Sequence, residues 1–459
     1  MRRSFLDDEE SKVTWFSSQS PLTSAARIED FILYDRKGLP LDDDDSSAAA
    51  SLPQTYQLID DPIIYFRTVP AGNASCFIDG TNWSISSTDC RCLDGYHGAN
   101  CGIPSVVWSS CLADACQLDE LRIRQKPRRI IHGFNINHEV QFLDIRLGEI
   151  GHVVDVFIVA ESNVTAGGDA KPLYILPALK KGAARRWQHK MLHVFIDHFP
   201  EEGYRDGWLA DTFLRDEMGR QGLARIQDIR SDDIFLLLDA DEIPSPQVLL
   251  FLKLYDGYPE PVALTLRWSV YGFFWRKAKA GTMEEEATTI VAAATMDMIR
   301  KVYDNKVMSL RRDRLMESPF VERLVEYRRS WSIATYKWNI GNVGQALFAG
   351  FHCSWCYDPE GIRLKLVSAQ KDDKPRWGDY PEKLDLQYIG SLVDKGCWFD
   401  GSKPLILVDQ QNEPYAPEYV IRNADRFERL LRHPAHLHGS YSSATVSEIT
   451  TAKQHLPLH

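Results

Sequence analysis

The chain has 459 residues, of which 44% are hydrophobic and 25% charged, the balance of a soluble globular protein. That length exceeds one ordinary core and suits a large catalytic domain with accessory segments. A formal net charge of −11 argues against a general nucleic-acid-binding protein, which would carry a basic surface.

The N-terminal residues 1–75 carry acidic runs at 7–10 and 42–45 and few periodic segments. Such a composition buries little apolar surface, so we expect a flexible acidic stem. No apolar stretch as long as a signal peptide or a membrane span occurs in the sequence. Because the next segment points to the secretory pathway, we expect that an N-terminal membrane anchor is missing from this sequence.

Residues 76–116 form a cysteine-rich segment that holds six of the nine cysteines. The string CRCLDGYHGANC at 90–101 has the cysteine and glycine spacing of the second half of an epidermal-growth-factor-like (EGF-like) module. In such a module Cys92 pairs with Cys101, and Cys76 with Cys90 is the candidate second bridge. The alternative is a zinc site, but only one histidine lies nearby and the spacing differs from zinc motifs.

Close-spaced cysteines in a loop-rich stretch indicate disulfides and an oxidising compartment. Three Asn-x-Ser/Thr sequons, at Asn73, Asn82 and Asn163, indicate N-glycosylation and therefore the same compartment. The pairing of the remaining cysteines is left open by the sequence, and these are Cys111, Cys116, Cys353, Cys356 and Cys397.

Residues 125–435 alternate strand-like and helix-like apolar runs, which predicts an α/β domain with a nucleotide-binding sheet. Strands are predicted at 128–136, 153–162, within 188–199, at 232–244 and, as a pair or one long strand, at 262–275. Helices are predicted at 138–151, 207–223 and 247–257. The tail at 436–459 is rich in Ser, Thr and His, and we expect it to be disordered.

The apolar run FLLL at 235–238 leads directly into Asp239, Asp241 and Glu242. Carboxylates at the edge of a core are costly unless a cation meets them. Ligands of α/β sheets bind beyond the carboxyl ends of the strands, where these acids are expected. Two acids one residue apart can hold Mn²⁺ or Mg²⁺, which would bridge the phosphates of a nucleotide. The alternative is a strand-end turn whose acids are solvated.

Several other polar residues each allow a functional and a structural interpretation. Glu161, at a strand end, could meet a ribose or base, or could cap a helix. Asp211 and Arg215 lie on the helix before the acid-tipped strand and face either a cofactor cleft or solvent. Lys365 and the RRDR run at 311–314 could neutralise a diphosphate, although an exposed charge run is the ordinary interpretation.

The string FHCSWCY at 351–357 contains a C-x-x-C pair, Cys353 and Cys356. A redox motif is one interpretation, but the strand-then-helix context of thioredoxin-like proteins is missing, which favours structural pairing, with Cys397 as a possible participant. His352 could be a third metal ligand, although a lone histidine is more often an ordinary core residue.

Several long strings occur in the order found in one enzyme family: RIIHGFNINHEVQFLDIRLGEIG, VVDVFIVAESNVT, LDADEIP, FLKLYDGYPEP, VYGFFW, FHCSWCYDPEGIRLKLVSAQ and RWGDYPEKLDL. They closely resemble glycosyltransferase family 17, and the similarity covers about residues 88–435. The resemblance implies a GT-A-like fold in a Golgi enzyme with a type II membrane anchor. It also implies transfer of GlcNAc from UDP-GlcNAc, with Mn²⁺ or Mg²⁺, to the core β-mannose of an N-glycan in β-1,4 linkage and with inversion.

Within that resemblance, the metal-binding acid motif of the family maps onto Asp239 and Asp241. Residues 278–298 depart from the family pattern, so the resemblance does not carry over the family's loop above the donor site. A carboxylate must deprotonate the acceptor hydroxyl, and Glu360 and Asp379 are the candidates. Trp275, Trp355 and Trp377 are candidates for stacking on sugars, with core packing as the alternative for each.

Two other classes of function compete with a transferase. A glycosidase would need two acids on opposite sides of a sugar and would ignore UDP and metal. A secreted adhesion module would explain the EGF-like half but not the acid turn or the α/β order. Metal dependence separates the transferase from the glycosidase, and any turnover excludes the adhesion module.

Overall fold

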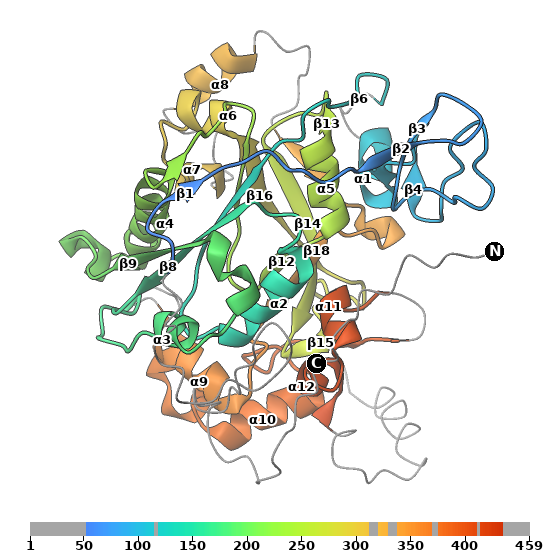
Figure 1. Cartoon of the computed structure of the whole chain (residues 1–459). Coiled ribbons are helices and arrows are strands. Elements are labelled where there is room, and N and C mark those ends of the chain that lie inside the picture. The colour runs from blue at the N-terminus through green and yellow to red at the C-terminus, as the bar shows by residue number, and fades with distance from the viewer. Residues whose placement is uncertain are drawn as a thin grey trace, which may run out of the picture.

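The computed structural model describes residues 52–113, 118–311, 320–328, 337–369, 375–410 and 414–434. Its centre is an 11-stranded mixed sheet with helices on both faces (Figure 1). The strand order is β12-β18-β14-β16-β11-β7-β8-β9, and β15, β17 and β19 attach beside β14. The predicted α/β domain with a mixed central sheet is confirmed.

The strands of the sheet are β7 (Ile130–Asn135), β8 (Val156–Ser162), β9 (Met191–Ile196), β11 (Ile234–Leu237), β12 (Glu242–Pro244), β14 (Val262–Val270), β15 (Gly272–Arg276), β16 (Ala287–Thr295), β17 (Trp338–Ile340), β18 (Gly350–Ser354) and β19 (Ile406–Leu407). The short strands outside it are β1 (Tyr56–Gln57), β2 (Phe66–Thr68), β3 (Ser75–Phe77), β4 (Tyr96–His97), β5 (Ile103–Pro104), β6 (Arg122–Ile123), β10 (Ile226–Gln227) and β13 (Tyr255–Asp256). The helices are α1 (Ser105–Ala113), α2 (Val140–Ile150), α3 (Ile175–Lys180), α4 (Gly207–Leu223), α5 (Pro246–Leu254), α6 (Met296–Lys301), α7 (Met308–Arg311), α8 (Val321–Arg328), α9 (Pro359–Val367), α10 (Leu386–Lys395), α11 (Glu418–Arg422) and α12 (Glu428–Leu431).

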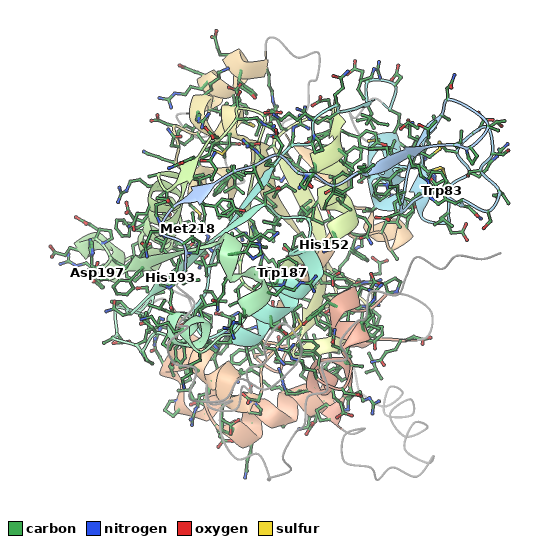
Figure 2. The ribbon with its side chains drawn as sticks, in the orientation of Figure 1. Trp83, His152, Trp187, His193, Asp197 and Met218 are labelled. Carbon is green, nitrogen blue, oxygen red and sulfur yellow. A yellow bond between two sulfur atoms is a disulfide. The ribbon has the colours of Figure 1, made fainter. Side chains whose placement is uncertain are left out.

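Strands β11, β7, β8 and β9 are parallel and form one half of the sheet, at the positions predicted for them. Every residue of β8 and β11 is buried, which explains why these strands read as continuous apolar runs. Helix α4 packs closely on β7, and Gly133 allows this because it has no side chain. A Cβ atom at Gly133 would lie only 2.7 Å from the side chain of Met218, which Figure 2 labels.

Strands β14, β16, β18 and β12 form the other half, and the predicted strand pair at 262–275 is confirmed as β14 and β15. Strand β16 is antiparallel to both β14 and β11 and so joins the two halves. The segment 278–298, which departs from the family pattern, contains β16, where β-branched residues and a buried C-terminal half form a strand. The predicted strand at 232–244 is divided into β11 and β12 by the acidic turn.

A third apolar cluster lies where β15 meets α9, α10 and α12, in the lower part of Figure 1. Trp275 belongs to it, is 8% exposed and donates its indole N–H to the carbonyl of Val393, so its role is core packing. Cys353 and Cys356 form a disulfide here, whereas Cys397 is a free thiol. The structural pairing predicted for the C-x-x-C string is confirmed, without Cys397.

The cysteine-rich segment, with β2, β3 and β4, projects from one side of the molecule beside α1 (Figure 1). The bridges Cys76–Cys90 and Cys92–Cys101 are both present, as predicted. Trp83 lies in this projection (Figure 2), under the guanidinium of Arg67 at 3.7 Å from the ring centre. Cys111 is also disulfide-bonded, and Cys116 lies outside the described residues.

The predicted stem boundary at residue 75 needs a correction, because residues 52–75 contact the body of the protein. Strand β1 pairs with β10, and Leu58 is only 3% exposed. The carboxylate of Asp61 lies 2.7 Å from the ammonium of the fully buried Lys253. These contacts are non-local, so the acidic composition concealed them. Residues 1–51 and the predicted tail lie outside the described residues, and none of the described helices has the length and apolarity of a membrane span.

Candidate active site

Asp239 and Asp241 lie in the turn between β11 and β12, and Glu242 is the first residue of β12, at the carboxyl edge of the parallel strands. The segment 239–242 is called the acidic turn. Strand β11 ends at Leu237, which pairs with Gly133 of β7, and β12 begins at Glu242, which pairs with His352 of β18. The turn therefore crosses from one half of the sheet to the other. Crevices of this kind, outside the carboxyl ends of strands, are where α/β proteins bind ligands.

Asp239 is held by two arginines from different helices. Its Oδ1 accepts a hydrogen bond of 2.5 Å from Arg215 of α4, and its Oδ2 accepts one of 3.0 Å from Arg311 of α7. Burial raises the pKa of Asp239, but the two guanidinium groups outweigh burial, so its pKa lies well below the usual 3.8. Arg215 also contacts Asp211 one helical turn earlier, which places both predicted residues beside the acids.

Glu242 shares Arg311 with Asp239, at 2.8 Å, and its carboxylate also accepts the backbone N–H of Asp239. Arg311 is thus a half-buried member of the site, and the interpretation of 311–314 as an exposed charge run is wrong for this residue. Residues 312–314 lie outside the described residues. The arginine is placed there by the short helix α7, which no local pattern in the sequence predicted.

Asp241 faces the other half of the sheet. Its Oδ2 lies 2.8 Å from the ammonium of Lys365 on α9, and its Oδ1 lies 3.7 Å from Nε2 of His352 on β18. Burial raises the pKa of Asp241, whereas Lys365 and His352 lower it, and the result is a pKa below the usual value. The pKa of Lys365 is raised, because Asp241 and Glu139 outweigh the effect of burial.

Arg146 on α2 lies behind the turn and was missed by the sequence analysis. It is 0% exposed and donates to the backbone carbonyls of Asp239 and of Glu242, the latter at 2.9 Å. It also contacts His132, and its guanidinium stacks 4.5 Å from the ring centre of Phe134. Because it ties both ends of the acidic turn, Arg146 is a positioning residue. A charged side chain on the apolar face of a predicted helix was the available signal.

The site fits a divalent cation only in part. Asp241 offers a carboxylate, the ligand that Mg²⁺ and Mn²⁺ prefer. Nε2 of His352 lies near Oδ1 of Asp241, and Nδ1 of His352 is buried without a hydrogen-bond partner. Asp239 fits less well, because both of its oxygens already accept from arginines. Among the described residues, no group of three or more His, Cys, Asp or Glu side chains is placed to hold a metal ion. Phosphate oxygens of a ligand would have to complete the coordination.

Unpaired acceptors gather at the ends of the neighbouring strands β7 and β8. Asn135 is the last residue of β7, the strand beside β11, and Asn163 directly follows β8. The side-chain oxygens of Asn135, Asn137 and Asn163 are buried without a hydrogen-bond partner. Buried polar atoms of native proteins are nearly always paired, so these acceptors mark a position for a hydrogen-bonding ligand.

Glu161 takes the structural role among its two interpretations. It is 0% exposed, and its carboxylate accepts the backbone N–H groups of Tyr174, Ile175 and Leu176 at the start of α3. His193 of β9, labelled in Figure 2, approaches it at 3.3 Å. Burial raises the pKa of Glu161, but His193 and the three backbone N–H groups lower it by more, so the pKa of Glu161 lies below the usual value. A buried, saturated carboxylate is not available to a ribose or base.

The structure does not bring either candidate base to the acidic turn. Glu360 lies in the first turn of α9, five residues before Lys365 and therefore about 140° away around the helix. Asp379 is 60% exposed and paired with Arg376. Of the sequons, Asn73 is exposed, while Asn82 and Asn163 are half-buried.

Comparison with known proteins shows what this chain is similar to. The model of glycosyltransferase family 17 matches residues 107–316. Proteins named beta-1,4-mannosyl-glycoprotein 4-beta-N-acetylglucosaminyltransferase are 45% identical over 347 residues in Mus musculus and Rattus norvegicus, and 44% in Homo sapiens. The aligned part is 75% of this chain and 62% of each relative, so the chain spans less than two thirds of their length. No solved structure matches the chain. The resemblance seen in the sequence is confirmed.

Proposed function

We propose that the protein transfers GlcNAc from UDP-GlcNAc to the core β-mannose of N-glycans, because residues 107–316 match the model of glycosyltransferase family 17. The linkage formed is β-1,4 and the anomeric configuration is inverted. The supporting observation is the acidic turn, where three carboxylates meet Arg215, Arg311 and Lys365 beyond the carboxyl end of β11. This arrangement suits a diphosphate, with cationic groups that offset charge on the leaving group.

Asp241 and His352 are the proposed ligands of Mn²⁺ or Mg²⁺, and Asp239 acts indirectly by orienting Arg215 and Arg311. The bound cation supplies Lewis-acid stabilisation of the UDP leaving group. Lys365, which pairs with Asp241 in this structure, would also contact the diphosphate of a bound donor. Arg146 holds the backbone of the turn in place throughout.

The nucleoside is proposed to lie over the ends of β7 and β8, where Asn135, Asn137 and Asn163 carry unpaired acceptors. The N–H groups of a uracil, or the hydroxyls of a ribose, are donors of the required kind. The acceptor sugar would then approach from the side of β18, because β18 and the pair β7 and β8 lie on opposite sides of β11 in the strand order.

The first test measures GlcNAc transfer from UDP-GlcNAc to a biantennary N-glycan, with and without Mn²⁺, for wild type and Asp241→Ala. We expect the substitution to lower turnover by about 10²–10³-fold. Asp256→Ala is the matched control, because Asp256 also binds two arginines, Arg124 and Arg128, at the remote strand β13. Full activity of Asp241→Ala, or transfer by the wild type that does not depend on metal, would refute the proposed role of Asp241 and the cation.

A second test follows from the incomplete donor set and needs no turnover. Titration calorimetry should show weak binding of Mn²⁺ alone and much tighter binding in the presence of UDP, since phosphate oxygens complete the site. His352→Ala should weaken binding of the UDP–Mn²⁺ pair. Equally tight binding of Mn²⁺ without UDP would contradict the proposed ligand set.

Glu360→Gln and Asp379→Asn test the two candidate bases. The base is the residue whose loss lowers kcat without weakening the binding of UDP-GlcNAc. If neither substitution lowers kcat by at least about tenfold, both assignments fail, since a general base contributes about 10²–10⁴-fold.

The disulfides support a location in the oxidising secretory pathway, and we propose the Golgi lumen with attachment through an N-terminal anchor. The domain order proposed is the acidic stem, the EGF-like piece, the GT-A-like catalytic domain at 125–435 and the tail. Glycosylation is proposed first at Asn73, the exposed sequon.

A further inference from the structure

Trp355 has an unusual backbone conformation close to the acidic turn. Its φ angle is +59°, in the left-handed region that large side chains rarely adopt. Such conformations persist only where the surrounding structure imposes them, and they gather at functional sites. The residue lies between the bridged Cys353 and Cys356, directly after strand β18.

Several covalent and hydrogen-bonded restraints impose this turn. The disulfide joins residues three positions apart, whose Cα atoms are 5.7 Å from each other. The N–H of Tyr271 donates to the carbonyl of Ser354 at 2.9 Å, and the N–H of Tyr357 donates to the carbonyl of Trp355 at 2.8 Å. Both cysteines are buried in the third apolar cluster. The disulfide and these two hydrogen bonds, together called the clamp, therefore determine where the indole of Trp355 points.

The indole of Trp355 is supported on one face and lies one side chain from Asp241. It stacks on the buried Phe399, with ring centres 4.9 Å apart and an interplanar angle of 18°. The ammonium of Lys365 lies 5.7 Å from the indole centre and 2.8 Å from Asp241. Trp355 is half-buried.

A second tryptophan borders the same acids. Trp268 is half-buried and stacks on His352, with ring centres 5.5 Å apart. Its indole N–H donates to Ser354 at 2.9 Å, which links it to the clamped turn. Trp398 contacts Trp268 edge-on, and Lys277 lies 4.0 Å from the Trp268 ring centre. Aromatic side chains with a few polar groups are the usual lining of a site for an organic ligand.

We propose that Trp355 is a sugar-stacking residue of the acceptor site, held in position by the Cys353–Cys356 disulfide. This inference rests on the proposed transferase function. In the strand order the unpaired acceptors lie on one side of β11, at β7 and β8, whereas Trp268 of β14 and Trp355, directly after β18, lie on the other side of β11. The apolar C–H face of a pyranose suits an indole, whereas a charged diphosphate does not.

The experiment measures acceptor and donor KM and kcat for the full chain with Trp355→Gly, Trp355→Ala and Trp355→Phe, using UDP-GlcNAc and a biantennary N-glycan. We expect the acceptor KM to rise about tenfold for Gly and Ala and less for Phe, with the donor KM unchanged. Glycine accepts a positive φ, so Trp355→Gly should be at least as stable as Trp355→Ala. Trp83→Ala is the control, because Trp83 is also half-buried but lies in the cysteine-rich segment, under Arg67.

The clamp is tested with the double variant Cys353→Ser/Cys356→Ser, for which we expect the same rise in acceptor KM with the donor KM retained. An acceptor KM that is unchanged in Trp355→Gly would overturn the proposal, and so would a rise confined to the donor KM. Quenching of tryptophan fluorescence by the acceptor glycan, in the presence of UDP, gives a readout without turnover. If the wild type transfers no GlcNAc at all, it is the proposed function that fails, which this comparison distinguishes.

Discussion

Replacement of Arg146 by methionine should remove activity without unfolding the protein. Methionine fills a similar volume but donates no hydrogen bond, so two buried carbonyls, of Asp239 and Glu242, lose their donor. Each such loss costs about 1–3 kcal/mol. Burial lowers the pKa of Arg146 to about 10 despite the nearby acids, which means that its charge is costly to bury. Removal of this charge therefore offsets part of the loss in stability. We expect a net loss of about 2–4 kcal/mol in the free energy of unfolding.

The assay combines thermal unfolding with initial rates of GlcNAc transfer, measured well below the unfolding temperature. Turnover should fall by at least about tenfold, because the acidic turn is no longer fixed. Arg128→Met is the matched control: Arg128 is also buried, donates to the carbonyl of Tyr255 and stacks 5.0 Å from the ring centre of Tyr258, but it lies far from the acids. The control should lose stability and keep its turnover. Wild-type kcat in Arg146→Met would refute the positioning role.

Three further predictions concern the charged groups. The pKa of Asp239 is lower in the folded protein, so its ion pairs stabilise the fold fully above pH 3.8 and lose this effect as the pH falls toward the folded pKa. The difference in unfolding temperature between wild type and Asp239→Asn should therefore be constant from pH 8 to about 5 and shrink below about 4. A difference that stays constant down to about pH 2 would contradict the lowered pKa. Glu161→Gln should lower the free energy of unfolding in urea by about 1–3 kcal/mol, because α3 loses its charged cap, and the donor KM should stay unchanged. A raised donor KM would instead indicate that Glu161 contacts the nucleotide. Lys365→Met should raise the donor KM about tenfold by removing a charge-assisted contact to the diphosphate, and an unchanged donor KM would show that Lys365 serves only Asp241.

Much of the fold was predictable because its signals are local. The buried parallel strands β8 and β11 are continuous apolar runs, and α4 has both of its ends where the periodicity places them. The Cys76–Cys90 and Cys92–Cys101 bridges follow from short, specific spacings. The acidic turn was also visible, because three carboxylates directly after an apolar run are costly without a partner.

The partners of those carboxylates were decided by tertiary structure alone. Arg311 approaches Asp239 from 72 residues away, and Lys365 approaches Asp241 from 124 residues away. Contacts between residues so far apart in the sequence produce no periodic pattern, because these ion pairs depend on where α7 and α9 pack. Strand β16 was missed for the same reason: its identity depends on pairing with β14 and β11, not on its own alternation. The sequence by itself determined that the end of β11 needs cations, and only the packing of separate helices around that end determined which residues supply them.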